Sequence, residues 1–289
     1  MTKIINGRDV SKSILAELKA EISGFKSSPG LAVILVGDNP ASKAYIGMKK
    51  KACEDLGVKS FEFILPAEAT ESELKDLLES LNQRNEVNGI LLQMPLPKHL
   101  DEQKMLELIH PSKDVDGFHP VNVGKLLIGL DSFKSCTPYG VVELLKRYEI
   151  ETSGKHVVIL GRSNIVGKPM AAMLVQNCEG GNATVTICHS RTANLKQITN
   201  SADILIAAIG KPEFVSKDMV KDDAVVIDVG INRVDDQSSE KGYKLVGDVD
   251  YESVKDKTSA ITPVPGGVGP LTIAMLMTNT VKAYLQTNS

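Results

Sequence analysis

Cysteine and aromatic residues are scarce in this sequence. Its 289 residues include only four cysteines, at positions 53, 136, 178 and 188, and aromatic residues make up 4% of the chain. No two cysteines form a CxxC pair, which excludes a disulfide scaffold and is typical of reduced, mostly buried thiols in a cytosolic protein. The five histidines show neither an HExxH motif nor a pairing with cysteine, so we expect no dedicated metal site.

An excess of one charge is absent as well. Lysine and arginine (33) nearly balance aspartate and glutamate (36), and the formal net charge is −3. We therefore expect neither a nucleic-acid partner nor binding to a membrane surface. Residues 258–281 lack charge, but their three prolines and three glycines exclude a membrane-spanning helix. The N-terminal residues carry charges every few positions and show no secretory signal.

Extended and helical patterns alternate along the chain, and its 42% apolar residues are ample for ordered cores. After an N-terminal strand and an amphipathic helix, we expect strands at 31–36, 61–65, 89–93, 156–160, 184–188, 204–208 and 225–229, and helices at 42–56, 71–82, 170–176 and 271–285. This alternation predicts an α/β fold with mainly parallel strands. Residues 94–140 lack clear periodicity and are the expected place for a domain boundary.

Residues 156–176 show the strand, glycine-rich turn and helix of a nucleotide-binding unit. Gly161 ends the strand and Gly167 follows before the helix, so the backbone can approach a pyrophosphate and present N–H groups at the helix start. Ser163 stands where the GxGxxG fingerprint has its second glycine, so the motif is incomplete. The spacing alone leaves open a turn that binds no ligand. The chain has no GxxxxGK[ST] or GxSxG motif.

The strand at 184–188 ends without the acidic residue that grips a bare ribose. Ser190 and Arg191 follow it, and Arg162 lies in the first turn. Two guanidinium groups and a hydroxyl suit a 2′-phosphate, and charge-assisted hydrogen bonds of about 1.5–3 kcal/mol each would favour NADP over NAD by at least tenfold. The alternative is that both arginines are ordinary surface charges.

Tyr45 and Lys49 lie four residues apart on the helix expected at 42–56. We predict an apolar face formed by Tyr45, Met48, Ala52 and Leu56, with Lys49 at its border. Burial would lower the pKa of this lysine toward neutrality and make it a candidate proton carrier. Spacing alone also allows, and by itself favours, an ordinary basic helix face.

Three further features lie where strands or helices meet loops. Gln93 closes the strand at 89–93, and Asp116 lies in the turn KDVDGF; an amide and a carboxylate can both hydrogen-bond the nitrogens of a heterocycle. The stiff loop PVPGGVGP at 263–270 exposes bare backbone to which a flat ligand could come close. Taken singly, Asp116 is also a turn residue and Gln93 a polar strand end.

Seven segments together resemble the bifunctional methylenetetrahydrofolate dehydrogenase/cyclohydrolase family, and the likeness runs from end to end in order. They are VGDNPASKAYIGMKKKACEDLG (36–57), GILLQMPLP (89–97), KDVDGFHPVNVG (113–124), GRSNIVGKP (161–169), ATVTICHSRT (183–192), IDVGIN (227–232) and PVPGGVGPLTIAMLM (263–277).

The resemblance implies that the enzyme oxidises 5,10-methylenetetrahydrofolate with NADP and then hydrolyses the methenyl product, in one-carbon metabolism and purine biosynthesis. Lys49 matches the family's general acid/base, Gln93 its hydrogen-bond partner, Tyr45 the aromatic residue over the folate and Asp116 the carboxylate that holds the pterin. The remaining matches are Ser42, Pro263, Gly266 and Gly267 on the folate side, and Gly161, Arg162, Ser163, Ser190, Arg191 and Ile231 around the dinucleotide.

The resemblance also implies two α/β domains flanking a cleft, the second a Rossmann-like doubly wound parallel sheet. We expect a folate-binding catalytic domain at 1–118 plus 271–289, an NADP-binding domain at 119–270, a homodimer and a cytoplasmic location. The alternatives are a dehydrogenase without efficient cyclohydrolase activity, a shikimate-type dehydrogenase, and a catalytically silent NADP- or folate-binding protein.

Overall fold

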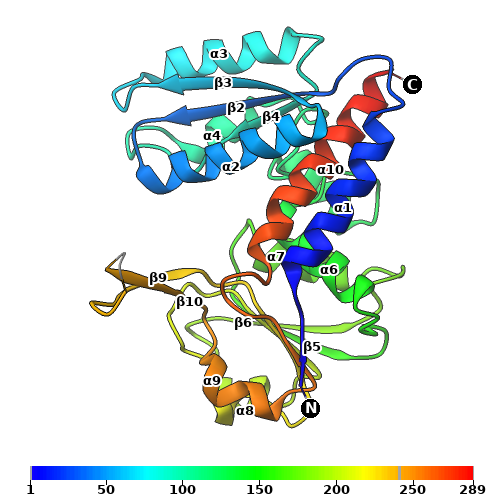
Figure 1. The fold of residues 1–289 in the computed structure, drawn as a ribbon, viewed down its shortest axis with the longest axis vertical. Coiled ribbons are helices and arrows are strands. Elements are labelled where there is room, and N and C mark those ends of the chain that lie inside the picture. The colour runs from blue at the N-terminus through cyan, green and yellow to red at the C-terminus, as the bar shows by residue number, and fades with distance from the viewer. Residues whose placement is uncertain (1, 240–241, 289) are drawn as a thin grey trace. The chain divides into compact units, whose positions relative to one another are not determined.

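The computed structural model of the chain describes residues 2–239 and 242–288, so the ends of the expected domains at Met1 and Ser289 lie outside the described residues. The chain forms two compact units (Figure 1). The six-stranded unit comprises Met1–Lys12 and Thr137–Thr272, and the three-stranded unit comprises Ser13–Cys136 and Ile273–Ser289. The α/β class with mainly parallel sheets is confirmed.

The sheet of the three-stranded unit is parallel, in the order β3-β2-β4. Every residue of the central strand β2 is buried, which is why its sequence GLAVILV is apolar throughout rather than alternating. The strands and helices of this unit are β2 (Gly30–Val36), α2 (Pro40–Leu56), β3 (Lys59–Leu65), α3 (Glu71–Gln83), β4 (Gly89–Leu92), α4 (Glu102–Glu107) and α5 (Pro120–Leu127).

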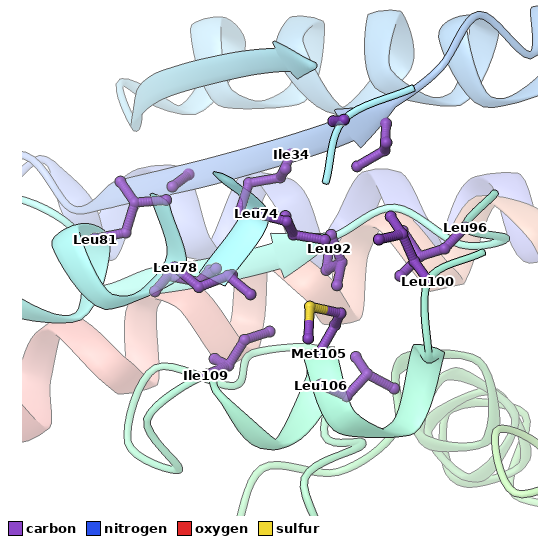
Figure 2. Close-up of a cluster of buried hydrophobic side chains, with 14 of the residues drawn as sticks. Ile34, Leu74, Leu78, Leu81, Leu92, Leu96, Leu100, Met105, Leu106 and Ile109 are labelled. Carbon is purple, nitrogen blue, oxygen red and sulfur yellow. The ribbon is translucent and has the colours of Figure 1, made fainter. Parts of the chain in front are cut away.

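One core of this unit lies between the sheet and the helices α3 and α4 (Figure 2). Leu74, Leu78 and Leu81 recur along α3 at helical spacing and are fully buried, and Met105 of α4 meets them. Helix α3 starts at a capping box, in which Thr70 and Glu73 each satisfy a backbone N–H of the other.

The sheet of the six-stranded unit is parallel, in the order β1-β11-β8-β7-β5-β6. The chain runs from β5 to β6 on one side and then to β7 on the other, so a topological switch point lies between β5 and β7. The strands are β1 (Lys3–Ile4), β5 (His156–Leu160), β6 (Thr184–Cys188), β7 (Ile204–Ala207), β8 (Val225–Asp228) and β11 (Ala260–Ile261).

Short helices and an antiparallel hairpin complete the six-stranded unit. Helices α1 (Gly7–Ile22) and α10 (Gly269–Asn288) contribute residues to both units. The other elements are α6 (Cys136–Arg147), α7 (Gly167–Leu174), α8 (Leu195–Thr199), α9 (Tyr251–Val254), the hairpin strands β9 (Asn232–Asp235) and β10 (Tyr243–Val246), and the 3-10 turns Lys217–Met219 and Lys255–Lys257.

All eight expected strands are present, the N-terminal one as β1, and β5 and β6 have the predicted bounds. The sequence did not predict the hairpin β9–β10, the short strand β11 or the short helices of the second half, because segments of two to five residues carry too little periodicity. Contacts assign residues 119–136 to the three-stranded unit, whereas we expected them in the NADP-binding domain. They assign residues 2–12 and 271–272 to the six-stranded unit, whereas we expected them in the folate-binding domain. The functional domain bounds stay a prediction.

Candidate functional site

The buried face of α2 differs from the predicted one. Ile46, Lys49 and Cys53 are buried, whereas Tyr45 and Met48 are 40% and 47% exposed. The predicted apolar face through Tyr45 and Met48 was therefore wrong. In the first half of α2 the buried face lies one residue further along the chain, whereas Ala52 and Leu56 are buried as expected. The reason is that Lys49 itself packs inward, where its ammonium group has a partner.

Lys49 is 8% exposed, and its Nζ donates a hydrogen bond to Gln93 Oε1 at 2.8 Å. Gln93 directly follows β4, and its Nε2 donates to the carbonyl of Met94 at 2.7 Å, which fixes the amide so that its oxygen faces the lysine. A neutral acceptor gives the ammonium a hydrogen bond without a full counter-charge. Burial lowers the pKa of Lys49, although the nearby charge of Asp116 opposes this effect.

Asp116 and Cys136 complete this buried group. Burial raises the pKa of the half-buried Asp116, against the opposing charge of Lys49 and a hydrogen bond from the Cys136 thiol. Burial also raises the pKa of Cys136 well above its ordinary value, so it remains a thiol. The structure thus brings Lys49, Gln93 and Asp116 together as predicted, and adds Cys136, which the sequence analysis placed only among the buried thiols.

Asp114 holds the turn that carries Asp116. Its carboxylate accepts hydrogen bonds from the backbone N–H groups of Phe118 (3.2 Å) and His119 (2.8 Å) and from Asn122 Nδ2 (2.8 Å). Burial raises the pKa of Asp114 to about 6, against the effect of these hydrogen bonds. Sequence reasoning did not single out Asp114, because its partners Phe118, His119 and Asn122 become neighbours only in the folded turn.

The glycine-rich turn of the six-stranded unit follows β5. Gly161 has φ +126°, and a Cβ there would lie 2.2 Å from the carbonyl oxygen of Ala208; a Cβ on Gly167 would lie 2.1 Å from the oxygen of Gly161. Both positions therefore require glycine.

The start of α7 does not present free N–H groups, contrary to our expectation. Ser163 Oγ accepts from the N–H groups of Val166 (3.1 Å) and Gly167 (3.4 Å), and Ser163 O accepts from Lys168 N (3.1 Å). The next residue, Pro169, has no N–H. The N–H groups at the start of α7 are therefore already bonded within the turn.

A pocket of about 300 Å³ lies at the carboxyl ends of β5, β6 and β7, beside the switch point. Arg162, Ser163 and Ser190 line it, and Arg191 follows Ser190. All four are exposed, and neither guanidinium group forms an ion pair with another described residue. The further lining residues, which sequence reasoning did not single out as ligand-binding, are Leu160, His189, Leu195, Ala208, Ile209, Lys211 and Phe214.

The remaining predicted residues lie in different places. Pro263, Gly266 and Gly267 belong to the six-stranded unit, where the carbonyl of Gly266 accepts a hydrogen bond from Gly7 N at 3.0 Å. Ile231 is 45% exposed after β8 and is not part of the pocket lining. Ser42 is 4% exposed on the buried face of α2.

Two family models match the chain. The model of the tetrahydrofolate dehydrogenase/cyclohydrolase catalytic domain matches residues 5–116, and that of the NAD(P)-binding domain of the same family matches residues 135–288. The chain belongs to this family. As a tetrahydrofolate dehydrogenase/cyclohydrolase it is an enzyme of one-carbon folate metabolism, both oxidoreductase and hydrolase, with an NAD(P)-binding domain.

Relatives of this tetrahydrofolate dehydrogenase/cyclohydrolase cover its full length. The bifunctional protein FolD of Chlorobium phaeobacteroides is 56% identical over 99% of this chain and 98% of its own. The structure of the bifunctional enzyme FolD of Campylobacter jejuni superposes with a TM-score of 0.93 at 50% identity, over 99% of each chain. That of the Trypanosoma brucei enzyme, complexed with NADP cofactor and inhibitor, has a TM-score of 0.93 at 38% identity, over 99% and 98%.

Membership of the family decides between the alternatives left by the sequence. A catalytically silent binding protein, a shikimate-type dehydrogenase and a dehydrogenase without the second activity are set aside. Within residues 2–239 and 242–288, none of the helices of the tetrahydrofolate dehydrogenase/cyclohydrolase combines the length and apolar character needed to cross a bilayer.

Proposed function

We propose that Lys49 is the proton carrier of the cyclohydrolase step on a 5,10-methenyltetrahydrofolate cation. The observation that carries this proposal is the buried ammonium group held at 2.8 Å by a neutral amide, with a lowered pKa. A lysine with a lowered pKa is neutral more often than an ordinary exposed lysine, and the neutral amine can accept a proton from water. The cationic substrate adds a repulsion that favours the neutral amine further.

The proposed reaction has two steps, an oxidation of the methylene carbon and a hydration of the resulting cation. NADP supplies the hydride acceptor when bound, and the methylene carbon loses a hydride to become the methenyl cation. Water then adds to that carbon while Lys49 accepts one of its protons. The bond from the carbon to N5 breaks as N5 gains the remaining proton of the added water. The products are reduced NADPH, 10-formyltetrahydrofolate and one released proton.

We assign the folate-binding roles to residues around this lysine. The Asp116 carboxylate has two oxygens that can accept from the amino-pyrimidine of the pterin, and Tyr45 supplies an exposed ring one helical turn from Lys49. Gln93 holds Lys49 in place and tunes its protonation. The family resemblance supports assigning Ser42, Pro263, Gly266 and Gly267 to the folate side.

We assign the 2′-phosphate of NADP to Arg162, Ser190 and Arg191. No acidic residue follows β6 within the pocket lining, and both arginines are exposed and form no ion pair with any residue that the structure describes. The pocket is lined by Gly161, Ser163 and the loop after β7, and its position at a switch point suits the adenosine half of a dinucleotide. The family resemblance supports Ile231 as a further cofactor residue.

A coupled assay tests the proposed function. The purified enzyme receives 5,10-methylenetetrahydrofolate and NADP, and the absorbances of reduced cofactor and of the methenyl intermediate are followed together. We expect reduced cofactor to form while little methenyl compound accumulates. In separate assays of methenyl hydrolysis, the rate should rise with pH at an apparent pKa well below that of an ordinary lysine. A profile with no such group would contradict the role of Lys49.

We also propose that the enzyme is a cytoplasmic homodimer, as the family resemblance implies. Light scattering after size-exclusion chromatography should give about twice the mass of one chain at micromolar concentration. A monomer mass across the concentration range would refute the dimer, and recovery of the enzyme in a membrane or periplasmic fraction of its cells would refute the location.

A further inference from the structure

Asp248 is a buried carboxylate of the six-stranded unit that lies two residues beyond β10 and is fully inaccessible. Its Oδ2 accepts hydrogen bonds from the backbone N–H groups of Ile209 (2.7 Å) and Gly210 (2.9 Å). Its Oδ1 accepts from the N–H of Lys211 and from Asn232 Nδ2, both at 2.9 Å. Three successive backbone N–H groups thus converge on one carboxylate.

This carboxylate is itself fixed in place by Asp228 at the end of β8. Asp228 Oδ1 accepts from the N–H of Asp248 and Oδ2 from the N–H of Val249, both at 2.9 Å. The packing is so tight that a Cβ on Gly247 would lie 1.8 Å from Asp228 Oδ2. The backbone that carries Asp248 therefore has little freedom to shift.

Backbone contacts extend the same attachment along the loop. Glu213 N donates to the carbonyl of Gly247 at 3.0 Å, and Val215 N donates to the carbonyl of Asp248 at 2.9 Å. Glu213 has φ +49°, which a non-glycine residue adopts only where its surroundings hold it. The loop from Ile209 to Val215 is thus held along most of its length by Gly247 and Asp248.

The same loop forms one wall of the cofactor pocket. Ala208, Ile209, Lys211 and Phe214 line the pocket, and Lys211 Nζ lies 5.5 Å from the centre of the Phe214 ring. Asp248 is not part of the lining, so it acts on a ligand of this pocket through the backbone that it holds. An aromatic ring with an ammonium group over it offers a flat surface suited to a purine.

We propose that Asp248 is a positioning residue for the cofactor, an inference that rests on the proposed pocket. Its carboxylate holds the loop after β7 in the shape that receives the adenosine part of the dinucleotide. NADP and NAD share that part. Loss of the loop's shape therefore weakens both cofactors by the same factor, whereas loss of a 2′-phosphate contact weakens NADP alone.

The substitution Asp248→Asn tests the proposal in the full-length enzyme. An amide nitrogen cannot accept a hydrogen bond, so at least one converging N–H group loses its partner. We expect the Kd values of NADP and NAD, measured by titration calorimetry, to rise about tenfold or more by the same factor, since a lost hydrogen bond to a charged group is worth that much. The kcat at saturating NADP should change by less than about threefold, because Asp248 is fully buried and does not line the pocket, so it touches neither cofactor nor substrate.

Asp203→Asn is the matched control. Asp203 also accepts a backbone N–H, from His156 at 2.9 Å, but at the amino end of the sheet. We expect this variant to leave both Kd values unchanged. An unchanged Kd in a folded Asp248→Asn variant, a rise for NADP alone, or a fall in kcat without a change in Kd would overturn the proposal.

Two measurements remain decisive if Asp248→Asn does not fold. Phe214 is 38% exposed, so Phe214→Ala should fold and raise both Kd values equally. In the wild-type enzyme without cofactor, the amides of Ile209, Gly210 and Lys211 should exchange slowly with deuterium. Fast exchange of these amides, or unchanged Kd values in Phe214→Ala, would refute the role of the loop. If the 2′-phosphate assignment were the error instead, Arg191→Ala would weaken NADP and NAD alike while the Asp248 results stood.

Discussion

The two units place their charged functional groups in opposite environments. In the three-stranded unit Lys49 is 8% exposed and held by Gln93. In the six-stranded unit Arg162 and Arg191 are exposed, and within residues 2–239 and 242–288 neither has an ion-pair partner. Burial changes the proton affinity of an amine, which a proton carrier needs. A guanidinium group keeps its charge in any environment, so a phosphate-binding arginine only has to be accessible. The burial of the lysine and the exposure of the arginines thus each suit the role that we propose for them.

The units resemble each other in one respect, which is that a buried carboxylate organises a functional loop in each. Asp114 accepts the N–H groups of Phe118 and His119, and Asp228 accepts those of Asp248 and Val249. Burial raises the pKa of both carboxyls to about 6. In both cases the carboxylate shapes backbone that carries other functional residues rather than touching a ligand itself.

The largest expected effect comes from removing the buried lysine of the three-stranded unit. Lys49→Met removes the proton carrier and should lower methenyl hydrolysis by about 10²- to 10⁴-fold, the usual contribution of general acid–base catalysis. Folate binding and hydride transfer should persist, because neither needs a protein base. The loss of methenyl absorbance measures the hydrolysis. Lys51→Met, an exposed change on the same helix, is the matched control; full hydrolysis in Lys49→Met would disprove the assignment.

The next effect concerns stability and Asp114. Its pKa is about 6 in the folded chain against an ordinary 3.8, so between these values the folded state keeps a proton that the unfolded state has lost. The free energy of unfolding contributed by this group should therefore fall as pH rises from about 4 to about 6, by at most about 3 kcal/mol, and stay level above.

Urea unfolding at several pH values, for the wild type and Asp114→Asn, isolates this contribution. The difference in unfolding free energy between the two proteins should vary with pH in that window only. A difference independent of pH would mean that the carboxyl ionises equally easily in both states.

A smaller effect is expected from removing an exposed arginine of the six-stranded unit. Arg191→Ala should raise the KM for NADP about tenfold, as expected for one charge-assisted hydrogen bond, and leave the KM for NAD nearly unchanged. Steady-state kinetics with each cofactor measures this, with NAD as the internal control. Because Arg191 is exposed, stability should not change. Equal effects on the two cofactors would show that Arg191 does not contact the 2′-phosphate.

The smallest expected effect separates stability from function within the three-stranded unit. Thr70→Ala removes the capping box of α3 and should lower the free energy of unfolding by about 1 kcal/mol. Since the side chain of Thr70 is bonded to Glu73 and not to Lys49, Gln93 or Asp116, kcat and KM should stay the same. Thermal unfolding and the coupled assay provide both readouts. A changed kcat would mean that α3 contributes to positioning the site.

Prediction from sequence succeeded where the signal was local. Apolar runs located β2, β5 and β6 to within a residue or two, and Gly161 indicated its turn. The reason is that burial and backbone conformation restrict which residue types occur at neighbouring positions. It failed for the face of α2. A rule that counts Lys49 as polar places Tyr45 and Met48 inward, and only the partner Gln93, 44 residues away, explains why the lysine is buried instead.

By itself, the order of residues determined the family, the α/β architecture and the supply of reactive groups, since these depend on runs and motifs that a single segment contains. Tertiary structure alone decided which of those groups are buried together, that Ser163 takes up the N–H groups at the start of α7, and that Asp248 holds a loop 39 residues distant. The physical reason is that a hydrogen bond or a desolvated charge depends on neighbours in space, and folding, not sequence proximity, chooses them.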